Sequence, residues 1–180
     1  CQNSQFDGIF SCDKVETVGI MAFESSQFTG YFNCPNVTLV DYNAFYYSVF
    51  NGVFDCPNLQ EVGNNAFFYS QFDGAFECPN VTSIGKFAFR FSNFTGEFNC
   101  PNLQTVGDHA FRNSKFSGSL NLPACTHLWY DAFLNSNFSG ELYIPNCVCI
   151  AQNAFYHSTF DTITIGANAT LGPSCIGAHS

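Results

Sequence analysis

The feature that most limits the folds open to this chain is a unit of 22 residues that repeats in strict phase. Phenylalanine stands at every 22nd position from Phe6 to Phe160, and an Ala-Phe pair recurs with the same spacing from residues 22–23 to residues 154–155. Serine, glycine and proline hold further columns of the same period. A period this short fits one coil of a solenoid, in which each unit packs only against its neighbours.

Each unit contains a strand signal followed by a return segment. Residues 94–100 alternate apolar and polar side chains, which is typical of a strand with one buried face. Pro101 ends this strand because it has no N–H for the ladder, and Leu103, Val106 and Phe111 then supply the inner side of the return segment. The sequence therefore predicts a β-rich solenoid of about eight 22-residue coils with one parallel β-sheet face.

The unit carries Ala88-Phe89, Phe94, Pro101 and Val106-Gly107 in an order that resembles the leucine-rich repeat of the BspA-like (Treponema pallidum) type. It departs from that pattern in having phenylalanine for most leucines and Ser92 where cysteine is preferred. The resemblance implies the right-handed superhelix of leucine-rich-repeat proteins. It also implies a non-enzymatic extracellular or cell-surface protein, which mediates adhesion or macromolecular interaction through its exposed strand face.

We expect one elongated domain over residues 1–165 and a degenerate last repeat or weak C-terminal cap over residues 166–180. In the last strand the apolar pair is shifted by one residue, so we expect Ile163 and Ile165 to be buried there. The chain starts at Cys1, in the middle of a unit, so we expect a processed or partial chain.

The charge balance argues against nucleic acid as a partner. The chain has 14 acidic and 5 basic side chains and a formal net charge of -9, whereas phosphate-binding surfaces need Lys and Arg. No apolar run has the roughly 18 residues needed to cross a bilayer. We therefore expect neither a nucleic-acid site nor a membrane span.

The 10 cysteines allow two interpretations. Those from Cys12 to Cys100 are spaced by 22 residues, and Leu122 and Ile144 continue their column, which is typical of a small buried hydrophobic side chain. Alternatively, cysteines on neighbouring coils have Cα atoms about 4.8 Å apart, which is within the range of a disulfide. The disulfide candidates are Cys125 with Cys147, and Cys149 or Cys175 near the end.

No combination of residues indicates catalysis. A nucleophile needs a base held against it, but His109, His127, His157 and His179 stand outside the serine column. We expect those serines to form a buried ladder that bonds to backbone groups. Because Cys147 and Cys149 have one residue between them, where zinc knuckles have about two to four, we expect no metal site, and no cofactor is required.

The chain also contains Asn-x-Ser/Thr triplets, which are acceptor sites for N-glycosylation in a secreted protein. Because asparagine after proline is also favourable turn chemistry, and Asn58 and Asn102 hold the same column without a triplet, a structural role is the alternative. The candidate glycosylation sites are Asn36, Asn80, Asn93, Asn137 and Asn168.

The outward positions of the strands form the candidate ligand-binding surface, since variable residues on a fixed frame suit recognition of protein or glycan. A solvated face has the same composition, and this alternative stays open. The outward residues are Ile9, Ser11, Val53, Ala75 and Ser119 together with the expected ligand-binding residues Tyr31, Asn33, Asp55, Glu77, Glu97, Asn99, Asn121, Glu141 and Tyr143.

A structural role is the alternative function. The first unit already has the residues of the repeat, such as Phe6, Gly8 and Phe10, and no polar cap precedes them in the sequence. Repeat stacks normally need caps for solubility. Such an end can associate with the end of another copy. The alternative is therefore a subunit of an extracellular filament or surface layer, assembled by end-to-end stacking of solenoids.

Overall fold

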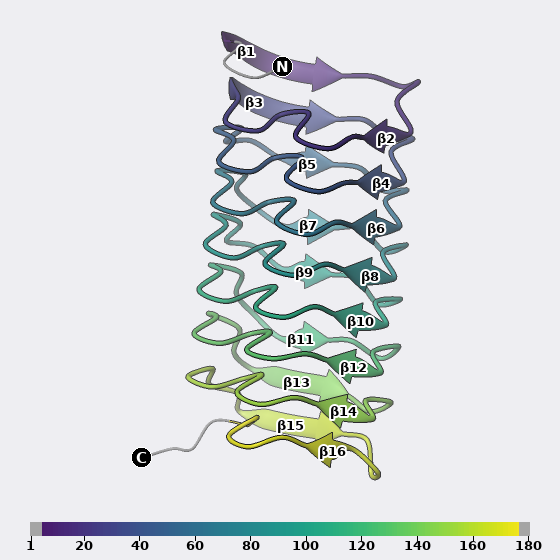
Figure 1. Ribbon diagram of the computed structural model, residues 1–180, viewed down its shortest axis with the longest axis vertical. Coiled ribbons are helices and arrows are strands. Elements are labelled where there is room, and N and C mark those ends of the chain that lie inside the picture. Colours follow the sequence, from purple (N-terminus) through teal and green to yellow (C-terminus); the bar gives the residue numbers. More distant parts are fainter. Residues whose placement is uncertain (1–4, 177–180) are drawn as a thin grey trace.

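The computed structural model describes residues 5–176 and is a solenoid of stacked coils (Figure 1). Each coil supplies one strand to a face ladder and a second, short strand to another ladder. No helix occurs among residues 5–176, so this part of the chain also has no helix of the length and apolar character that crossing a membrane requires. The predicted solenoid with a 22-residue period is confirmed.

The face ladder is made of parallel strands and is divided into sheets of three, two and three strands. Its strands are β1 (Gln5–Ser11), β3 (Gln27–Asn33), β5 (Phe54–Asp55), β7 (Phe76–Glu77), β9 (Phe98–Asn99), β11 (Leu120–Asn121), β13 (Glu141–Ile144) and β15 (Thr162–Ile165). The alternating pattern predicts this face, but the strand that it indicates over residues 94–100 is shorter in the structure, where β9 covers only Phe98–Asn99.

The structure adds a second parallel ladder, where the sequence predicted a single sheet face. It is one continuous 8-stranded sheet. Its strands are β2 (Thr17–Val18), β4 (Leu39–Val40), β6 (Glu61–Val62), β8 (Ser83–Ile84), β10 (Thr105–Val106), β12 (His127–Leu128), β14 (Cys149–Ile150) and β16 (Thr170–Leu171). From β2 to β14 the second residue of each strand is buried, so this ladder closes the core opposite the face ladder.

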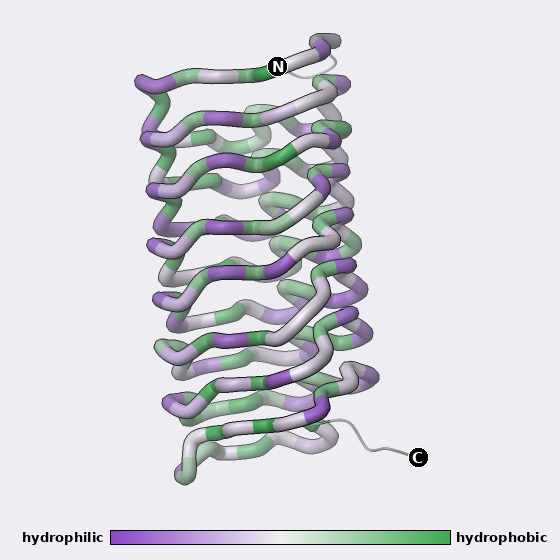
Figure 2. The backbone as a smooth tube through the Cα atoms, turned by 180° about the vertical axis from the view of Figure 1, so that it is seen from behind, coloured by the Kyte–Doolittle hydropathy of each residue, from purple (hydrophilic) through white to green (hydrophobic). Residues whose placement is uncertain are grey.

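Strand pairing holds equivalent residues in register along the stack. Phe32 pairs with Phe54 and Val40 with Val62, each 22 positions on. Figure 2 shows hydrophobic and hydrophilic residues alternating along the coils and recurring at similar places in successive coils. Equivalent side chains therefore form continuous internal columns.

The last face strand follows the shifted register that the sequence predicts, since Leu142 pairs with Ile163 and Ile144 with Ile165. Ile165 packs against the core, but Ile163 is 44% exposed, so its predicted burial is wrong. The sequence pattern determines the column that Ile163 joins. Burial also requires a further coil that covers Ile163 on the side away from Leu142, and none of the described residues forms such a coil.

Residues 166–176 continue the stack instead of leaving it. They contain β16, which pairs with β14, and an isolated bridge joins Ile176 to Phe155. Cys175 is buried there. The boundary at residue 165 stays a prediction, and residues 177–180 lie outside the described part.

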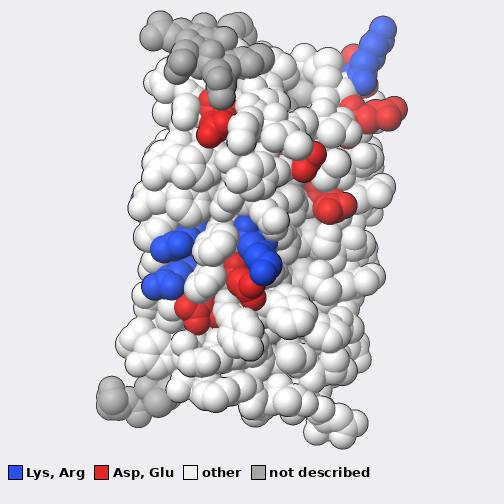
Figure 3. Space-filling view, viewed as in Figure 1, with Lys and Arg blue, Asp and Glu red and all other residues white. Residues whose placement is uncertain are grey.

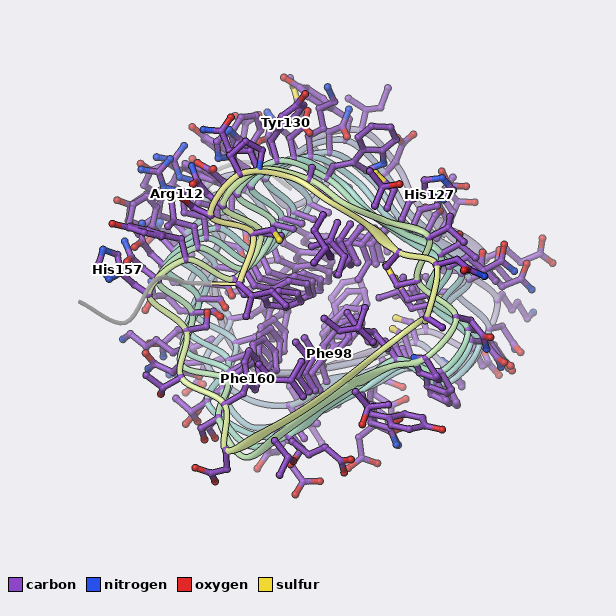
Figure 4. The ribbon with its side chains drawn as sticks, turned by 90° about the horizontal axis from the view of Figure 1, so that it is seen from below. Phe98, Arg112, His127, Tyr130, His157 and Phe160 are labelled. Carbon is purple, nitrogen blue, oxygen red and sulfur yellow. The ribbon has the colours of Figure 1, made fainter. Side chains whose placement is uncertain are left out.

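The centre of the core is made mainly of stacked phenylalanine rings (Figure 4). The columns that end at Phe155 and Phe160 run the length of the described solenoid, whereas the column of Phe98 continues as Leu120 and Leu142. Phe89 stacks on Phe111 with ring centroids 5.1 Å apart, and Phe94 stacks on Phe116 at 5.2 Å. Rings of different columns meet edge to face, as Phe98 and Phe111 do at 4.9 Å. Stacked and edge-to-face pairs are both favourable for aromatic rings. The side chain of Phe6, the first member of one column, lies outside the described part.

The segment that carries the Ala-Phe pair turns sharply twice in each coil. In the second coil Asn43 and Tyr47 have φ values of 55° and 53°. The equivalent residues of the next coils also have the positive φ of the left-handed backbone conformation. The N–H of Phe45 donates to the carbonyl oxygen of Ala66 at 2.8 Å, which ties the turn to the next coil. This outer side of the solenoid is called the turn face below, and it comprises residues 42–47, 64–69, 86–91, 108–113 and 130–135.

Candidate interaction surfaces

The serine column is buried, as predicted, but most of its hydroxyls do not bond to backbone groups. Ser158 Oγ donates to the carbonyl oxygen of Phe133 at 2.9 Å and lies 3.1 Å from Ser136 Oγ. The hydroxyls of Ser26, Ser48, Ser70, Ser92 and Ser114 are buried without a hydrogen-bond partner. The expected ladder of side-chain to backbone bonds is therefore wrong for these five serines.

The described histidines do not activate any of these serines. His127 Nδ1 lies 2.9 Å from Thr126 Oγ1, His157 is exposed, and His109 faces Asp131. His179 lies outside the described residues. Within residues 5–176, no group of three or more His, Cys, Asp or Glu side chains is placed as the ligands of a metal ion would be.

The cysteine column lies in the core. Burial raises the pKa of the Cys34 thiol to about 11, and it also raises the pKa of Cys56, Cys78 and Cys100. A thiol in such surroundings stays protonated and behaves as a small hydrophobic group. This environment favours the first interpretation of the column.

Cys125 and Cys147 are neighbours in one column, and both thiols donate to backbone carbonyl oxygens. Cys125 Sγ lies 3.7 Å from the oxygen of His127, and Cys147 Sγ lies 3.5 Å and 3.4 Å from the oxygens of Thr126 and Cys149. The interaction between the two neighbouring thiols raises the pKa of Cys125 and lowers the pKa of Cys147. Cys149 is half-buried on the outer side of β14, whereas Cys175 takes the place in the turn that Ala154 holds one coil earlier. The structure thus brings the first pair together and puts Cys149 and Cys175 in different columns. A disulfide between Cys125 and Cys147 stays a prediction.

The outward residues of the face ladder form a strip that changes character along the stack. Ile9, Tyr31 and Val53 are 59%, 50% and 48% exposed and follow one another in successive coils. Toward the C-terminal end, exposed carboxylates and amides take over. Asn33, Ala75 and Tyr143 are half-buried, and the exposed members of the predicted set are Tyr31, Asp55, Glu77, Glu97, Asn99, Asn121 and Glu141.

The asparagines that follow the prolines have a structural role. Asn36 Nδ2 donates to the carbonyl oxygen of Asp13 at 2.6 Å and Asn80 Nδ2 to that of Pro57 at 3.1 Å, and Asn58 and Asn102 make the same bond. Among the remaining triplets, Asn137 and Asn168 are exposed, and Asn93 is half-buried and accepts a hydrogen bond from Lys115. Glycosylation of any of the five stays a prediction.

A groove of about 480 Å³ lies where the chain passes from the second ladder to the turn face. Its lining residues are Asn64, Ile84, Gly85, Lys86, Thr105, Gly107, Asp108, Trp129 and Tyr130. A Cβ at Gly85 would lie 2.6 Å from the backbone nitrogen of Asn64, so glycine lets the two coils approach closely there. Successive glycines therefore leave a trough on the outside of the solenoid.

Trp129 and Tyr130 are 43% and 53% exposed and bound this groove on one side. A second hollow of about 230 Å³ lies on their other side. Neither residue was predicted as a site residue, because both lie outside the invariant columns of the repeat. The sequence does mark this position, because Trp129 replaces the glycine that the three preceding coils have there as Gly63, Gly85 and Gly107. It is also the only tryptophan in the sequence.

The turn face carries an aromatic column on its outside. Tyr47 stacks on Tyr69 with centroids 4.8 Å apart, and Tyr69 stacks on Phe91 at 4.6 Å. Tyr46 stacks on Phe68 beside them at 5.0 Å. These rings are half-buried or exposed, so the turn face presents aromatic surface next to the groove.

Three basic residues, Lys86, Arg90 and Arg112, lie on this same face. Figure 3 shows a mostly uncharged surface on which most of the basic side chains lie close together, mixed with acidic ones, while a separate and mainly acidic group lies at the upper right. Lys86 Nζ lies 2.8 Å from Asp108 Oδ2, and Arg112 Nη1 lies 3.3 Å from Asp131 Oδ2. The two acidic residues thus compensate two of the three positive charges.

His109 lies among these charged groups, with Nδ1 3.3 Å from Asp131 Oδ2. Burial, together with the charges of Arg112 and Arg90, holds the pKa of His109 below its ordinary value, against the opposing effect of Asp131 and Asp108. The imidazole therefore favours its neutral form, and it does not add to the positive charge of the turn face at neutral pH.

Comparison with known proteins agrees with this architecture. The model of the BspA type leucine rich repeat region matches residues 1–73 and 60–177 in 6 copies. No curated protein and no solved structure matches the chain significantly.

Proposed function

Because the chain belongs to the BspA type leucine-rich-repeat family, we propose that it is a non-enzymatic, extracellular or cell-surface protein that mediates adhesion or macromolecular interaction through its strand face. The family suggests protein interaction. The finer points, namely the location, the adhesive role and the face used, are our proposal.

The observation that carries the proposal is the apolar part of the strand face. Ile9, Tyr31 and Val53 are each about half exposed and lie on three successive rungs. Single exposed apolar residues are ordinary, but a contiguous row is typical of an interaction site. The rungs are backed by a buried core, so the row is presented on a rigid frame, and repeated weak contacts along it add up to useful affinity.

The proposal is tested by binding to an array of immobilised extracellular proteins and glycans. A Tyr31→Ser/Val53→Ser variant should lose most of its binding, since the few residues that dominate an interface, among which tyrosine is enriched, each contribute about 2 kcal/mol or more. A Gln60→Ser/Gln104→Ser variant, altered at exposed positions outside the strand face, is the control. Unchanged binding of the first variant, with an unchanged melting temperature, would refute the assignment to this face.

End-to-end assembly is the second candidate function. Ile163 and Leu171 are 44% and 55% exposed, whereas Leu142 and Ile150, with which they pair, are fully buried. A head-to-tail contact that does not close into a ring produces a filament. Electron microscopy would show fibres that an Ile163→Lys/Leu171→Lys variant cannot form, and monodisperse particles at all concentrations would contradict this candidate.

A further inference from the structure

Arg90 on the turn face is a basic group that the fold does not neutralise. Its guanidinium carbon lies 5.0 Å from the ring centroid of Phe91, 5.6 Å from that of Phe87 and 5.9 Å from that of Phe68. Its Nε is buried without a hydrogen-bond partner. Among the described residues Arg90 has no carboxylate partner, although the chain has 14 acidic and 5 basic side chains. Aromatic rings, and no anion, hold this arginine in place.

Arg112 occupies the same column on the next coil, where the N–H of Phe91 donates to its carbonyl oxygen at 3.2 Å. Neighbouring coils are about 4.8 Å apart, so two positive side chains are placed on adjacent rungs and repel each other. Asp131 is the carboxylate paired with Arg112, and Asn153 also bonds to it. The pair of arginines therefore has fewer negative charges around it than positive ones.

The groove adjoins these arginines. Lys86 and Asp108, which form an ion pair, line the groove and precede Phe87 and His109 in the turn face. The N–H of His109 donates to the carbonyl oxygen of Tyr130 at 2.8 Å. Figure 4 shows Tyr130 and Arg112 on neighbouring parts of the outer side of the coil. A basic site and a mostly apolar groove thus lie next to each other.

We propose that this part of the turn face binds an acidic polypeptide segment. One carboxylate of the segment is held by Arg90 and Arg112, and a neighbouring apolar side chain enters the groove beside Trp129. Guanidinium groups suit carboxylates because their N–H donors match the two oxygens.

A peptide fits this surface better than a sulfated glycan does. The guanidinium group of Arg90 is surrounded by the rings of Phe68, Phe87 and Phe91. These rings offer no neutral hydrogen-bonding groups to the sugar hydroxyls that would lose water beside a bound sulfate. An apolar side chain needs none, and aromatic residues with arginine are typical of the centres of protein interfaces. The site lies apart from the strand face, so the inference goes beyond the proposed function.

Fluorescence anisotropy tests the proposal with a short fluorescein-labelled peptide in which glutamates flank one phenylalanine. The matched probe has glutamines in place of the glutamates, and a heparin oligosaccharide represents sulfated glycans. The acidic peptide should bind, and added salt should weaken its binding. Either equal binding of the glutamine peptide, or binding of heparin alone, would overturn the proposal.

Variants locate the site. Arg90→Gln should weaken binding of the acidic peptide about tenfold or more, as expected for the loss of a hydrogen bond to a charged group. Lys14→Gln, which removes the same charge from an exposed position outside the turn face, should leave it within about twofold. Equal effects of the two variants would show that binding depends on net charge alone and would overturn the assignment.

Two further variants keep the test decisive. Arg90→Lys retains the charge and should recover part of the binding if Arg90→Gln proves poorly folded by circular dichroism. The Tyr31→Ser/Val53→Ser variant of the strand face should bind the acidic peptide normally. A loss there, with Arg90→Gln unaffected, would move the peptide site to the strand face and refute the inference while supporting the proposed function.

Discussion

Replacing Ser70 by alanine should stabilise the protein, even though serine recurs at this position in every coil. Ser70 is fully buried and its hydroxyl has no hydrogen-bond partner. Burying a hydroxyl without a partner costs about 1–3 kcal/mol on the basis of mutational data. Alanine lacks only the oxygen, so the cavity that it leaves is small. We expect a gain of about 1 kcal/mol, or about 2–4 °C in melting temperature for a chain of this size.

Ser158 is the matched control because it belongs to the same column but is hydrogen-bonded. Its hydroxyl donates to the carbonyl oxygen of Phe133 and contacts Ser136 Oγ. Ser158→Ala removes both contacts and leaves the hydroxyl of Ser136 without this partner. We expect a loss of about 1–2 kcal/mol.

The assay is urea and thermal unfolding of both variants, followed by circular dichroism at one pH. Repeat arrays lose two-state behaviour when neighbouring coils uncouple, so agreement of calorimetric and van't Hoff enthalpies must be checked. A Ser70→Ala variant that is about 1 kcal/mol less stable than the parent would refute the reasoning, because the hydroxyl would then have a partner.

Three further outcomes are expected. Gly85→Ala should destabilise the protein by about 1–3 kcal/mol, because the new Cβ would lie 2.6 Å from a backbone nitrogen of the preceding coil. A Cβ at Gly19 would have no atom within 4 Å, so Gly19→Ala should leave the stability unchanged. Equal urea midpoints of the two variants would contradict this expectation. Mass spectrometry after iodoacetamide treatment of the folded protein should show half-buried Cys149 labelled and Cys34 intact, because burial raises the pKa of Cys34 to about 11. Burial lowers the pKa of His109, so the unfolded chain binds more protons and stability falls as the pH drops below about 6.5; His109→Gln should make this decline shallower, and an unchanged slope would exclude the effect.

The core could be predicted from the sequence because its residues recur every 22 positions. Phe94, Phe98 and Cys100 recur at fixed spacing, and strand alternation assigns all three to the inside, where they are buried. The second ladder could not be predicted in the same way. A strand of two residues such as Thr105–Val106 is too short to show alternation, and hydrogen bonds to neighbouring coils define it.

Other features depend on distances and neighbours that a repeat pattern does not specify. Ser136 and Ser158 bond to each other while Ser70, in the same column, has no partner. Ile163 joins the predicted column but is exposed because the described residues place no coil beyond it.

The candidate site was the least predictable part. The outward residues of the face ladder could be predicted, because apolar and polar side chains alternate along its strands. The apolar row of Ile9, Tyr31 and Val53 among them is exposed, as this alternation requires. Arg90 stands in a column where the unit varies, and Trp129 interrupts a column that holds glycine in the three preceding coils. The repeat itself gave no reason to connect these two residues with each other. Only the stacking of the coils places such residues on one outer surface.

Distances between probes at equivalent positions test the stacking most directly. Glu16, Gln104 and Val148 are exposed members of one column. Gln104 lies four coils from Glu16, and Val148 lies six coils from Glu16. Double electron–electron resonance between spin-labelled non-natural residues at Glu16 and Gln104 should give about 19 Å, and between Glu16 and Val148 about 29 Å, since each coil adds about 4.8 Å. A second distance equal to or shorter than the first would show that the chain does not stack coil upon coil, and it would contradict the account.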